Sequence, residues 1–313
     1  MEFRRLGRTG LNVSQIGLGT VELGLEYGIA AEGTLRKPSR TEAAQLLNQA
    51  LDSGINFVDT ARVYGDSEEI IGWALKSRRH EYILSSKVTC RGYENEGKVT
   101  LRGHVTSSIH QSLRALQTDV IDLMQLHSVS ADEIRRGALA DILQELRAAG
   151  GIRFLGATTY GEEAALAALE DGRYDCIQIA YNVLDREPET RVLPLAQSKD
   201  VGVVVRSVLL KGALTHRYRC LPAGLEELKS AVEKTIALAS MGPGSLPEFA
   251  YRFVLAHPAV STALVGTALV DELKAALEYC TRGPLSSQSQ ADARQVAIQD
   301  RKQLNPGNWP PWQ

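Results

Sequence analysis

Eight short apolar segments, separated by longer helical patterns, most restrict what this chain can fold into. Each segment is a continuous apolar run rather than a strict alternation of apolar and polar residues. Such runs are typical of parallel strands that are buried on both faces. We predict strands at Gln15–Leu18, Ile55–Val58, Tyr82–Ser85, Val120–Leu126, Ile152–Gly156, Cys176–Ala180, Gly202–Val205 and Ser261–Val265.

Helical patterns fill the intervals between these runs. Several of them stop at a glycine, at Gly54, Gly150 and Gly172, where a helix commonly ends. We predict helices at Arg40–Ser53, Ser67–Lys76, Gly103–Gln117, Ala138–Ala149, Glu162–Asp171, Glu189–Ser198, Leu225–Ser240 with Leu246–Ala256, and Val270–Tyr279.

This alternation of strands and helices predicts an α/β protein with the (β/α)8 or TIM barrel fold. The 313 residues suit one such barrel with additions, and no low-complexity linker divides them, so we expect a single domain over residues 1–313. The predicted additions are an N-terminal β-hairpin cap in "FRRLGRTGLNVS" and an extra C-terminal helix at Ser286–Arg301. A doubly wound dinucleotide fold is the main competitor, but Glu22 stands where its third glycine would fall.

Charge and cysteine usage exclude several classes of protein. The net charge of −2 argues against a nucleic-acid partner, and no apolar stretch is long enough to span a membrane. The start of the chain lacks the apolar core of a signal peptide, and the four cysteines are scattered, so we expect free thiols and a cytoplasmic location. The six histidines show no ligand spacing, so no metal is expected.

Four ionisable side chains follow three adjacent predicted strands. Asp59 and Tyr64 come after the second strand, Lys87 after the third and His127 after the fourth. In a TIM barrel the carboxyl ends of the strands form the working face. Each residue alone has an ordinary structural role available to it, but their joint placement at one rim favours an active site.

These four residues suit the protonation of a developing alkoxide. A phenol has a pKa of about 10. A neighbouring ammonium lowers that value, a carboxylate would hold the ammonium in place, and a histidine could orient the substrate oxygen. The sequence offers no nucleophile–base pair and no second carboxylate for glycoside hydrolysis. A site of this kind needs a cofactor that supplies hydride.

The segment "NFVDTARVYGDSEEIIG" resembles the signature of the aldo-keto reductase family. The segments "RRLGRTGLNVSQIGLGT", "ILSSKV" and "SSIHQSLRALQTDVIDLMQLH" resemble its hairpin and first strand, its lysine strand and its second signature. The resemblance implies a barrel that binds NAD(H) or NADP(H) at its carboxyl face. It also implies that Tyr64 is the general acid or base, that Lys87, bonded to Asp59, lowers the pKa of Tyr64, and that His127 orients the carbonyl.

The predicted cofactor segments depart from the family pattern at two places. Thr158 and Thr159 replace a serine–asparagine pair that holds the carboxamide, and Arg206 replaces the aromatic ring that stacks on the nicotinamide. A guanidinium can also stack, although Arg206 could instead pair with an acid. The predicted cofactor residues are Gly19, Thr20, Asp59, Thr158, Thr159, Gln178, Arg206, Ser207, Val208, Leu209, Lys211, Gly212, Val265, Gly266, Thr267 and Glu272.

Two further positions favour NAD(H) over NADP(H). Ala268 and Glu272 stand where members of the family that prefer NADP carry basic or polar residues. Neither neutralises a 2′-phosphate, and a carboxylate is suited to accept hydrogen bonds from a free ribose hydroxyl.

Loops set substrate choice in such a barrel, and here they are polar. The loops are Leu23–Ser39, Thr89–Val99, Ser128–Asp132 and Thr215–Gly224, and Val21 replaces a tryptophan of the pocket. They favour a hydroxylated or charged carbonyl compound such as a sugar, unless these side chains are merely solvated. The polar and aromatic loop residues are Tyr27, Glu32, Arg36, Arg91, Tyr93, Glu94, His216, Arg217, Tyr218 and Arg219.

The tryptophans are expected to be structural. Trp73 is predicted to lie in the core, and Trp309 and Trp312 to anchor the tail. Two other functions remain open: a non-catalytic, nucleotide-sensing regulatory subunit of the same fold, and a metal-dependent barrel enzyme. The intact set of four residues argues against the first, and the lack of clustered ligands argues against the second.

Overall fold

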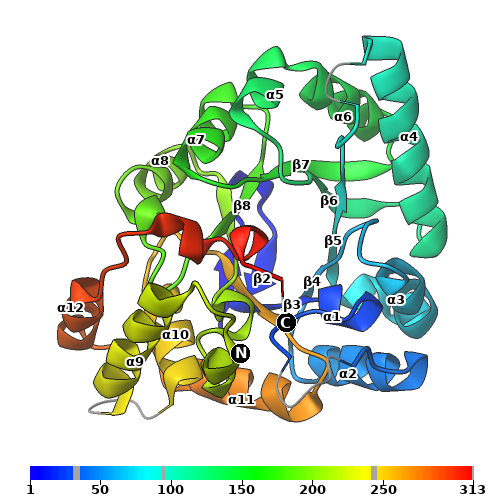
Figure 1. The fold of residues 1–313 in the computed structure, drawn as a ribbon. Coiled ribbons are helices and arrows are strands. Elements are labelled where there is room, and N and C mark those ends of the chain that lie inside the picture. The colour runs from blue at the N-terminus through cyan, green and yellow to red at the C-terminus, as the bar shows by residue number, and fades with distance from the viewer. Residues whose placement is uncertain (31–35, 94–95, 241–244, 312–313) are drawn as a thin grey trace.

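Eight parallel strands close into a barrel in this computed structural model, which describes residues 1–30, 36–93, 96–240 and 245–311. The strands follow one another around the barrel in chain order, and the last pairs with the first (Figure 1). The predicted TIM barrel is therefore confirmed. The strands are β3 (Ile16–Gly19), β4 (Phe57–Asp59), β5 (Ile83–Val88), β6 (Ile121–Leu126), β7 (Ile152–Thr158), β8 (Cys176–Ala180), β9 (Gly202–Arg206) and β10 (Thr262–Gly266).

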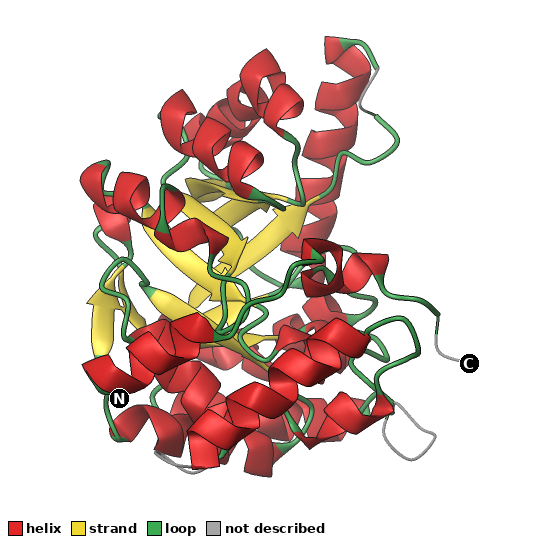
Figure 2. Ribbon diagram, turned by 60° about the vertical axis from the view of Figure 1, so that its left-hand side comes forward, coloured by secondary structure: helices red, strands yellow, loops and turns green. Residues whose placement is uncertain are grey.

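Helices surround the barrel on its outside (Figure 2). The larger apolar cluster of the protein lies between their inner faces and the strands, which is why the strand sequences are apolar on both faces. The helices are α1 (Val21–Gly24), α2 (Arg40–Asp52), α3 (Ser67–Leu75), α4 (Lys98–Ala115), α5 (Ala131–Arg136), α6 (Ala138–Ala148), α7 (Glu162–Asp171), α8 (Val192–Ser198), α9 (Glu226–Ser240), α10 (Leu246–Leu255), α11 (Val270–Thr281) and α12 (Ser287–Gln295).

The predicted hairpin closes the amino-terminal end of the barrel. β1 (Phe3–Arg5) pairs antiparallel with β2 (Asn12–Ser14). Leu6 and Val13 belong to a second apolar cluster, which includes the barrel residues Phe57 and Val204. Because the hairpin covers this end, we expect the functional site at the carboxyl ends of the strands.

The C-terminal segment lies at the opposite end from the hairpin (Figure 2). α12 confirms the extra helix, but it stops at Gln295 instead of continuing to Arg301. Asp300 caps a separate 3-10 turn, Arg301–Leu304, by accepting a hydrogen bond from the amide of Lys302, and a second turn, Pro306–Asn308, follows. Trp309 packs partly buried against the core, as an anchor would, whereas Trp312 lies outside the described residues.

Several predicted boundaries were wrong by a few residues. β5 extends to Val88, so Lys87 lies within the strand and not after it. α4 begins at Lys98 and not at Gly103, and α8 begins at Val192 because a 3-10 turn, Glu187–Glu189, precedes it.

A short helix occupies part of the predicted loop Ser128–Asp132. α5 starts with a capping box in which Ser130 and Glu133 bond to each other's backbone amides, and it ends at Gly137, whose φ of 75° is left-handed. The pattern of a serine followed three residues later by a glutamate was present in the sequence. The loop Thr215–Gly224 likewise contains a 3-10 turn, His216–Cys220.

Trp73 is not a core residue. It lies on the outer face of α3 with 48% of its surface exposed, and the Arg40 guanidinium stacks over its ring at 4.4 Å. α3 presents Ile70, Ile71 and Leu75 to the core instead. Trp73 therefore belongs to a surface cation–π pair. No helix in the described part of the chain is both long enough and apolar enough to span a membrane.

Candidate active site

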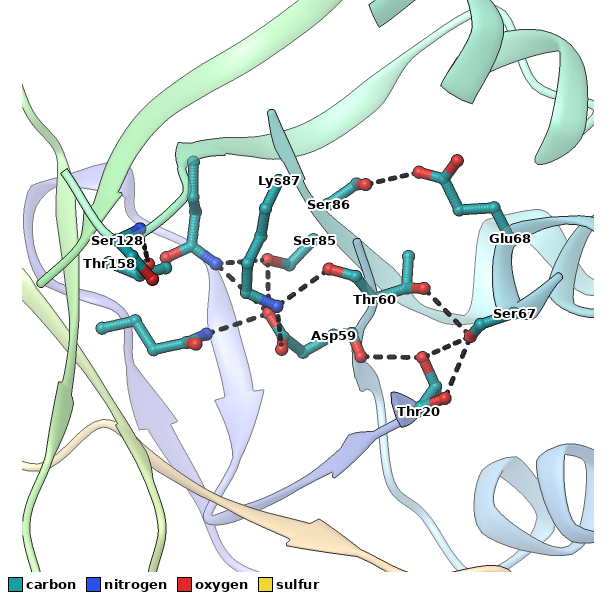
Figure 3. A network of polar contacts seen from close by, with 12 residues as sticks. Thr20, Asp59, Thr60, Ser67, Glu68, Ser85, Ser86, Lys87, Ser128 and Thr158 are labelled. Atoms are coloured by element: carbon teal, nitrogen blue, oxygen red, sulfur yellow. Dashed lines mark hydrogen bonds and ion pairs between the residues drawn. The ribbon is translucent and has the colours of Figure 1, made fainter. Parts of the chain in front are cut away.

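A buried ion pair lies at the carboxyl ends of β4 and β5. Lys87 Nζ donates to Asp59 Oδ2 at 2.5 Å and to the Thr60 carbonyl oxygen at 2.8 Å (Figure 3). The two side chains are only 1% and 3% exposed. Burial alone would lower the pKa of Lys87, but Asp59 and Tyr64 outweigh burial and raise it. The ammonium form is therefore held in place, as the sequence led us to expect.

Three further donors converge on the other oxygen of Asp59. Oδ1 accepts hydrogen bonds from Ser85 Oγ at 3.0 Å, Gln125 Nε2 at 3.2 Å and Gln178 Nε2 at 2.9 Å. Gln178 is one of the predicted cofactor residues, and its amide nitrogen is directed at Asp59. Side chains from β5, β6 and β8 thus hold the Asp59 carboxylate in place, and Asp59 in turn holds the Lys87 ammonium.

Two glycines set the position of the loop that carries Tyr64. A Cβ on Gly24 would lie 1.8 Å from the Tyr64 carbonyl oxygen. Gly65 has a φ of 57°, and a Cβ there would lie 2.3 Å from the Gly24 carbonyl oxygen. Only glycine permits this approach, so α1 is packed directly against the backbone on which Tyr64 stands.

The polar residues after Tyr64 tie the same loop to the barrel. Ser67 Oγ donates to Thr20 Oγ1 at 2.8 Å, and Thr20 Oγ1 donates to the Asp59 carbonyl oxygen at 3.0 Å (Figure 3). The buried Glu68 accepts from Ser86 Oγ at 2.6 Å and pairs with Arg62 at 2.7 Å. These contacts give Ser67 and Glu68, which follow the tyrosine in the segment resembling the family signature, a structural role.

Tyr64, Lys87 and His127 meet at the mouth of the barrel. Lys87 Nζ lies 4.8 Å from the centre of the Tyr64 ring, and the Tyr64 and His127 rings meet edge to face at 5.8 Å. Burial raises the pKa of Tyr64, and the Lys87 ammonium lowers it by less. The net direction is opposite to our expectation, because desolvation of the phenolate outweighs its attraction to the ammonium.

His127 is held in its neutral form. Burial first, and then the charges of Lys87, Arg206 and Arg91, lower the pKa of His127 to about 3. At neutral pH the imidazole therefore has one donor and one acceptor nitrogen.

The predicted carboxamide site at the end of β7 is partly open. Thr158 Oγ1 accepts a hydrogen bond from the Ser128 amide at 2.7 Å. Thr159 Oγ1 is buried and has no hydrogen-bond partner. Buried hydroxyls normally have a hydrogen-bond partner, so the Thr159 hydroxyl is free to form a hydrogen bond with a ligand.

Arg206 does not pair with an acid. Among the described residues no carboxylate lies within ion-pair distance of it, so that alternative was wrong. Its guanidinium stacks over the Tyr160 ring at 4.1 Å and donates to the Thr159 carbonyl oxygen at 3.0 Å and to Ser207 Oγ at 3.3 Å. We expected the Arg206 guanidinium to stack on a nicotinamide ring, and in this structure it stacks on Tyr160.

The segment after β9 has a strained backbone. Ser207, Leu210 and Lys211 all have left-handed φ values, of 61°, 45° and 57°, although none is a glycine, and Gly212 follows with a φ of 101°. Such residues cluster at ligand-binding segments. Val208 is buried, Leu209 is half-buried, and Lys211 Nζ lies 5.3 Å from the Tyr27 ring centre.

Four of the predicted cofactor residues lie at or after the end of β10, beside β3. They are Val265, Gly266, Thr267 and Glu272. Val265 and Gly266 pair with Leu18 and Gly19. The Glu272 carboxylate already has partners within the protein. It accepts a hydrogen bond from Thr267 Oγ1 at 2.5 Å and forms an ion pair with Arg217 at 3.0 Å. This ion pair joins the segment after β9 to α11.

The predicted loop residues that the structure describes lie in different surroundings. Arg36 pairs with Glu42 on the surface, and the Tyr93 ring stacks on His104 at 3.9 Å. Glu32 and Glu94 lie outside the described residues. The remaining predicted loop residues are Tyr27, exposed near Lys211; Arg91 and His216, both exposed; Arg217, paired with Glu272; and Arg219, next to the buried Tyr218.

A cavity of about 300 Å³ lies between the ends of β7, β8 and β9 and the C-terminal segment. Thr159, Arg206 and Ser207 line it from the barrel, and Lys302 and Asn305 line it from the tail. Its size suits a small-molecule site. The C-terminal segment therefore shapes a space that borders the predicted cofactor residues.

Sequence reasoning missed several residues of the site. Ser85, Gln125 and Glu68 were not among the predicted site residues, although all three are buried. The available indication was a polar residue inside an otherwise apolar strand, as in "ILSSKV" and "IDLMQL". Glu22 was also missed, and it lies against Gly266.

Comparisons with known proteins identify the family of this chain. A sequence profile described as "Aldo/keto reductase family" matches residues 15–298. The aldo-keto reductase YhdN of Bacillus subtilis is 31% identical, with 95% of this chain and 93% of that protein covered. The L-galactose dehydrogenase of Arabidopsis thaliana is 33% identical, with 88% and 86% covered.

Solved structures give the same result. The holo form of the aldo-keto reductase AKR11C1 from Bacillus halodurans superposes with a TM-score of 0.78 at 30% identity, with 95% of this chain and 97% of that chain covered. The chain belongs to the aldo/keto reductase family and is an oxidoreductase of that family. Members of this family generally use nicotinamide cofactors.

Proposed function

We propose that this protein interconverts a carbonyl compound and its alcohol by nicotinamide-dependent hydride transfer, with Tyr64 as general acid and base. The observation that carries the proposal is the meeting of Tyr64, Lys87 and His127 at one mouth of the barrel. This arrangement places a proton donor, a fixed positive charge and a neutral imidazole around one point.

In carbonyl reduction, the Tyr64 hydroxyl donates its proton to the substrate oxygen. Its raised pKa keeps the phenol protonated beforehand. The Lys87 ammonium then stabilises the phenolate that remains, and Asp59 holds Lys87 for that task. Neutral His127 orients the carbonyl by a hydrogen bond, and the cofactor, when bound, supplies the hydride.

Residues at the ends of β3, β7, β9 and β10 would hold the cofactor. The unpartnered Thr159 hydroxyl suits a carboxamide. Arg206 and Lys211 have no carboxylate partner in the described part of the chain and suit an anionic or π-rich ligand. Gly19 and Gly266 stand side by side at the ends of β3 and β10, and the Glu22 carboxyl group lies against Gly266.

The test is Tyr64→Phe. We expect kcat for reduction of simple aldehydes to fall by about 10²–10⁴, while the dissociation constant for NADH changes little. Loss of NADH absorbance measures the first quantity, and quenching of protein fluorescence measures the second. A chain that binds NADH tightly but turns over no carbonyl compound would instead be the non-catalytic regulatory subunit.

We further propose that NAD(H) is used at least as well as NADP(H), because Glu272 and Ala268 offer no positive charge to a 2′-phosphate. Glu272→Gln removes the negative charge and releases Arg217 from its ion pair, so we expect it to narrow the ratio of kcat/KM for NADH over NADPH by about tenfold, which corresponds to about 1.4 kcal/mol. A strong NADPH preference in the unmodified protein would contradict this.

The polar loops favour hydroxylated or charged substrates such as a sugar, and the similarity to an L-galactose dehydrogenase supports aldoses as the first substrates to try. A panel of sugars and simple aldehydes, assayed in both directions, tests this. Higher kcat/KM for apolar aldehydes than for every sugar would argue against it.

A further inference from the structure

Glu22 is a buried carboxyl group for which the proposed mechanism has no use. It stands in α1, directly after β3, and the residue as a whole is half-buried. Its Oε2 atom is buried and has no hydrogen-bond partner. A Cβ on Gly266 would lie 2.7 Å from its Oε1. The carboxyl group therefore fills the space beside the last residue of β10.

The surroundings of Glu22 disfavour a negative charge. Burial is the largest cause that raises the pKa of Glu22, to about 7, and the charge of Glu272 raises it further. Its own backbone amide and Arg217 act in the opposite direction, but Arg217 is already paired with Glu272. Tyr27 and Tyr251 also face Glu22, and its charge raises the pKa of both phenols.

Glu22 lies among the predicted dinucleotide residues. Gly19 and Thr20 precede it in the chain, and Gly266 lies against its carboxyl group. A dinucleotide bound beside Glu22 would bring two negatively charged phosphates and exclude water. Both changes disfavour an ionised carboxylate and favour its protonated form, which has one O–H donor.

We propose that Glu22 contacts the nicotinamide cofactor as a neutral, protonated side chain that donates a hydrogen bond to a cofactor oxygen, so that cofactor binding takes up one proton. The inference rests on the proposed function only in that the ligand is a nicotinamide dinucleotide. It makes Glu22 a cofactor-binding residue, with no part in the proton transfer of Tyr64.

The expected size follows from the fraction of protein in the competent form. When only protonated Glu22 binds, the apparent dissociation constant is the intrinsic value divided by the protonated fraction. Around a midpoint near neutral pH, affinity for NADH should weaken about tenfold between about pH 6 and about pH 8.

The experiment measures NADH binding by fluorescence across this range in the Tyr64→Phe background, where no turnover can interfere. Glu22→Gln keeps the shape and an N–H donor, so its affinity should stay near the low-pH value at every pH. Glu22→Leu should bind more weakly, also without pH dependence. His216→Gln, a change to an exposed histidine beside Arg217 in the chain, should keep the slope of the unmodified protein.

Calorimetry in buffers of different ionisation enthalpy counts the protons directly. Near pH 7 we expect uptake of a substantial fraction of one proton per NADH bound, and none in Glu22→Gln. A pH slope that persists in both Glu22 variants would overturn the inference. So would affinity that strengthens as pH rises, because Glu22 would then accept a hydrogen bond from a ribose hydroxyl. Failure of the proposed function would appear separately, as unchanged turnover in Tyr64→Phe.

Discussion

The two sides of the barrel mouth differ in how completely their polar groups are satisfied. On the β4–β6 side, both oxygens of Asp59 are bonded, and Lys87 has two acceptors. One amide oxygen there, on Gln125, has no partner. On the side formed by β3, β7 and β10, Thr159 and Glu22 both leave buried side-chain oxygens unpaired. On the first side the ionised groups have all their partners within the protein, whereas on the second side two buried oxygens remain free to bond the proposed cofactor.

The backbone differs in the same way. On the β4–β6 side the left-handed positions include Gly65, at little cost, and one non-glycine residue, Ser128, with a φ of 58°. After β9, three non-glycine residues adopt left-handed conformations, at an expected 1–2 kcal/mol or so each. Proton-transfer groups need a fixed geometry before the reaction, while a binding segment can hold strain that ligand contacts offset.

The largest effect on stability should come from breaking the buried ion pair between Lys87 and Asp59. Lys87→Met leaves Asp59 buried without its cation, so we expect a loss of about 3–5 kcal/mol in the free energy of unfolding, measured with urea. The double variant Lys87→Met/Asp59→Asn should recover most of that loss.

Lys98→Met is the matched control. Lys98 pairs with Asp141 at 3.5 Å on the surface, and removal of such a pair should cost less than about 1 kcal/mol. Equal losses in Lys87→Met and Lys98→Met would show that burial does not distinguish the two pairs.

A smaller effect should follow from crowding the loop of Tyr64. Gly65→Ala combines a left-handed conformation with a clash against the Gly24 carbonyl oxygen, so we expect a loss of about 2–4 kcal/mol in unfolding free energy. Because the strained residue adjoins Tyr64, kcat should fall about tenfold or more.

Gly10→Ala is the control that separates the effect of a left-handed backbone from the effect of lying next to Tyr64. Gly10 also has a left-handed φ, of 70°, but nothing lies within 4 Å of its added Cβ, and it belongs to the hairpin turn. We expect a loss of about 1–2 kcal/mol and an unchanged kcat. A kcat that falls equally in both variants would contradict the role given to the Gly24–Gly65 contact.

The smallest effect concerns pH. His127 has a folded-state pKa of about 3, below its unfolded value, so the unfolded chain binds more protons between these pKa values. Its contribution to stability is complete above the unfolded pKa and is lost as pH falls. Between about pH 7 and about pH 5 the loss should reach up to about 2 kcal/mol.

Comparison with His127→Asn isolates this contribution. Glu22, whose folded-state pKa is raised, gives a slope of opposite sign, and the difference between the two proteins cancels it. Parallel stability curves for the unmodified protein and His127→Asn, followed by urea unfolding, would mean that His127 titrates alike in both states.

Much of the fold was predictable because burial dictates it locally. All eight strands and the main helices were found from runs and periods of apolar residues, whereas the short helices α1 and α5 were missed and boundaries such as the start of α4 were wrong. Trp73 was misplaced because an aromatic residue on an amphipathic helix can be covered by a surface cation as well as by the core.

The candidate site was predictable only in part. Asp59, Tyr64, Lys87 and His127 were found because the ends of adjacent parallel strands must meet. The net pKa direction of Tyr64 was missed, since its burial depends on loops such as the one held by Gly24 and Gly65. Burial of that kind leaves no periodic trace in a sequence.

The sequence alone thus determined the barrel, its capped end and the rim where ionisable groups gather, because apolar periodicity and strand order act over short stretches. Tertiary structure alone decided the polar partners: Gln178 with Asp59, which are 119 residues apart, and Arg217 with Glu272. It also decided that Glu22 is buried beside Gly266. Hydrogen bonds and desolvation depend on neighbours in space, and side chains far apart in the chain become neighbours only when the barrel closes.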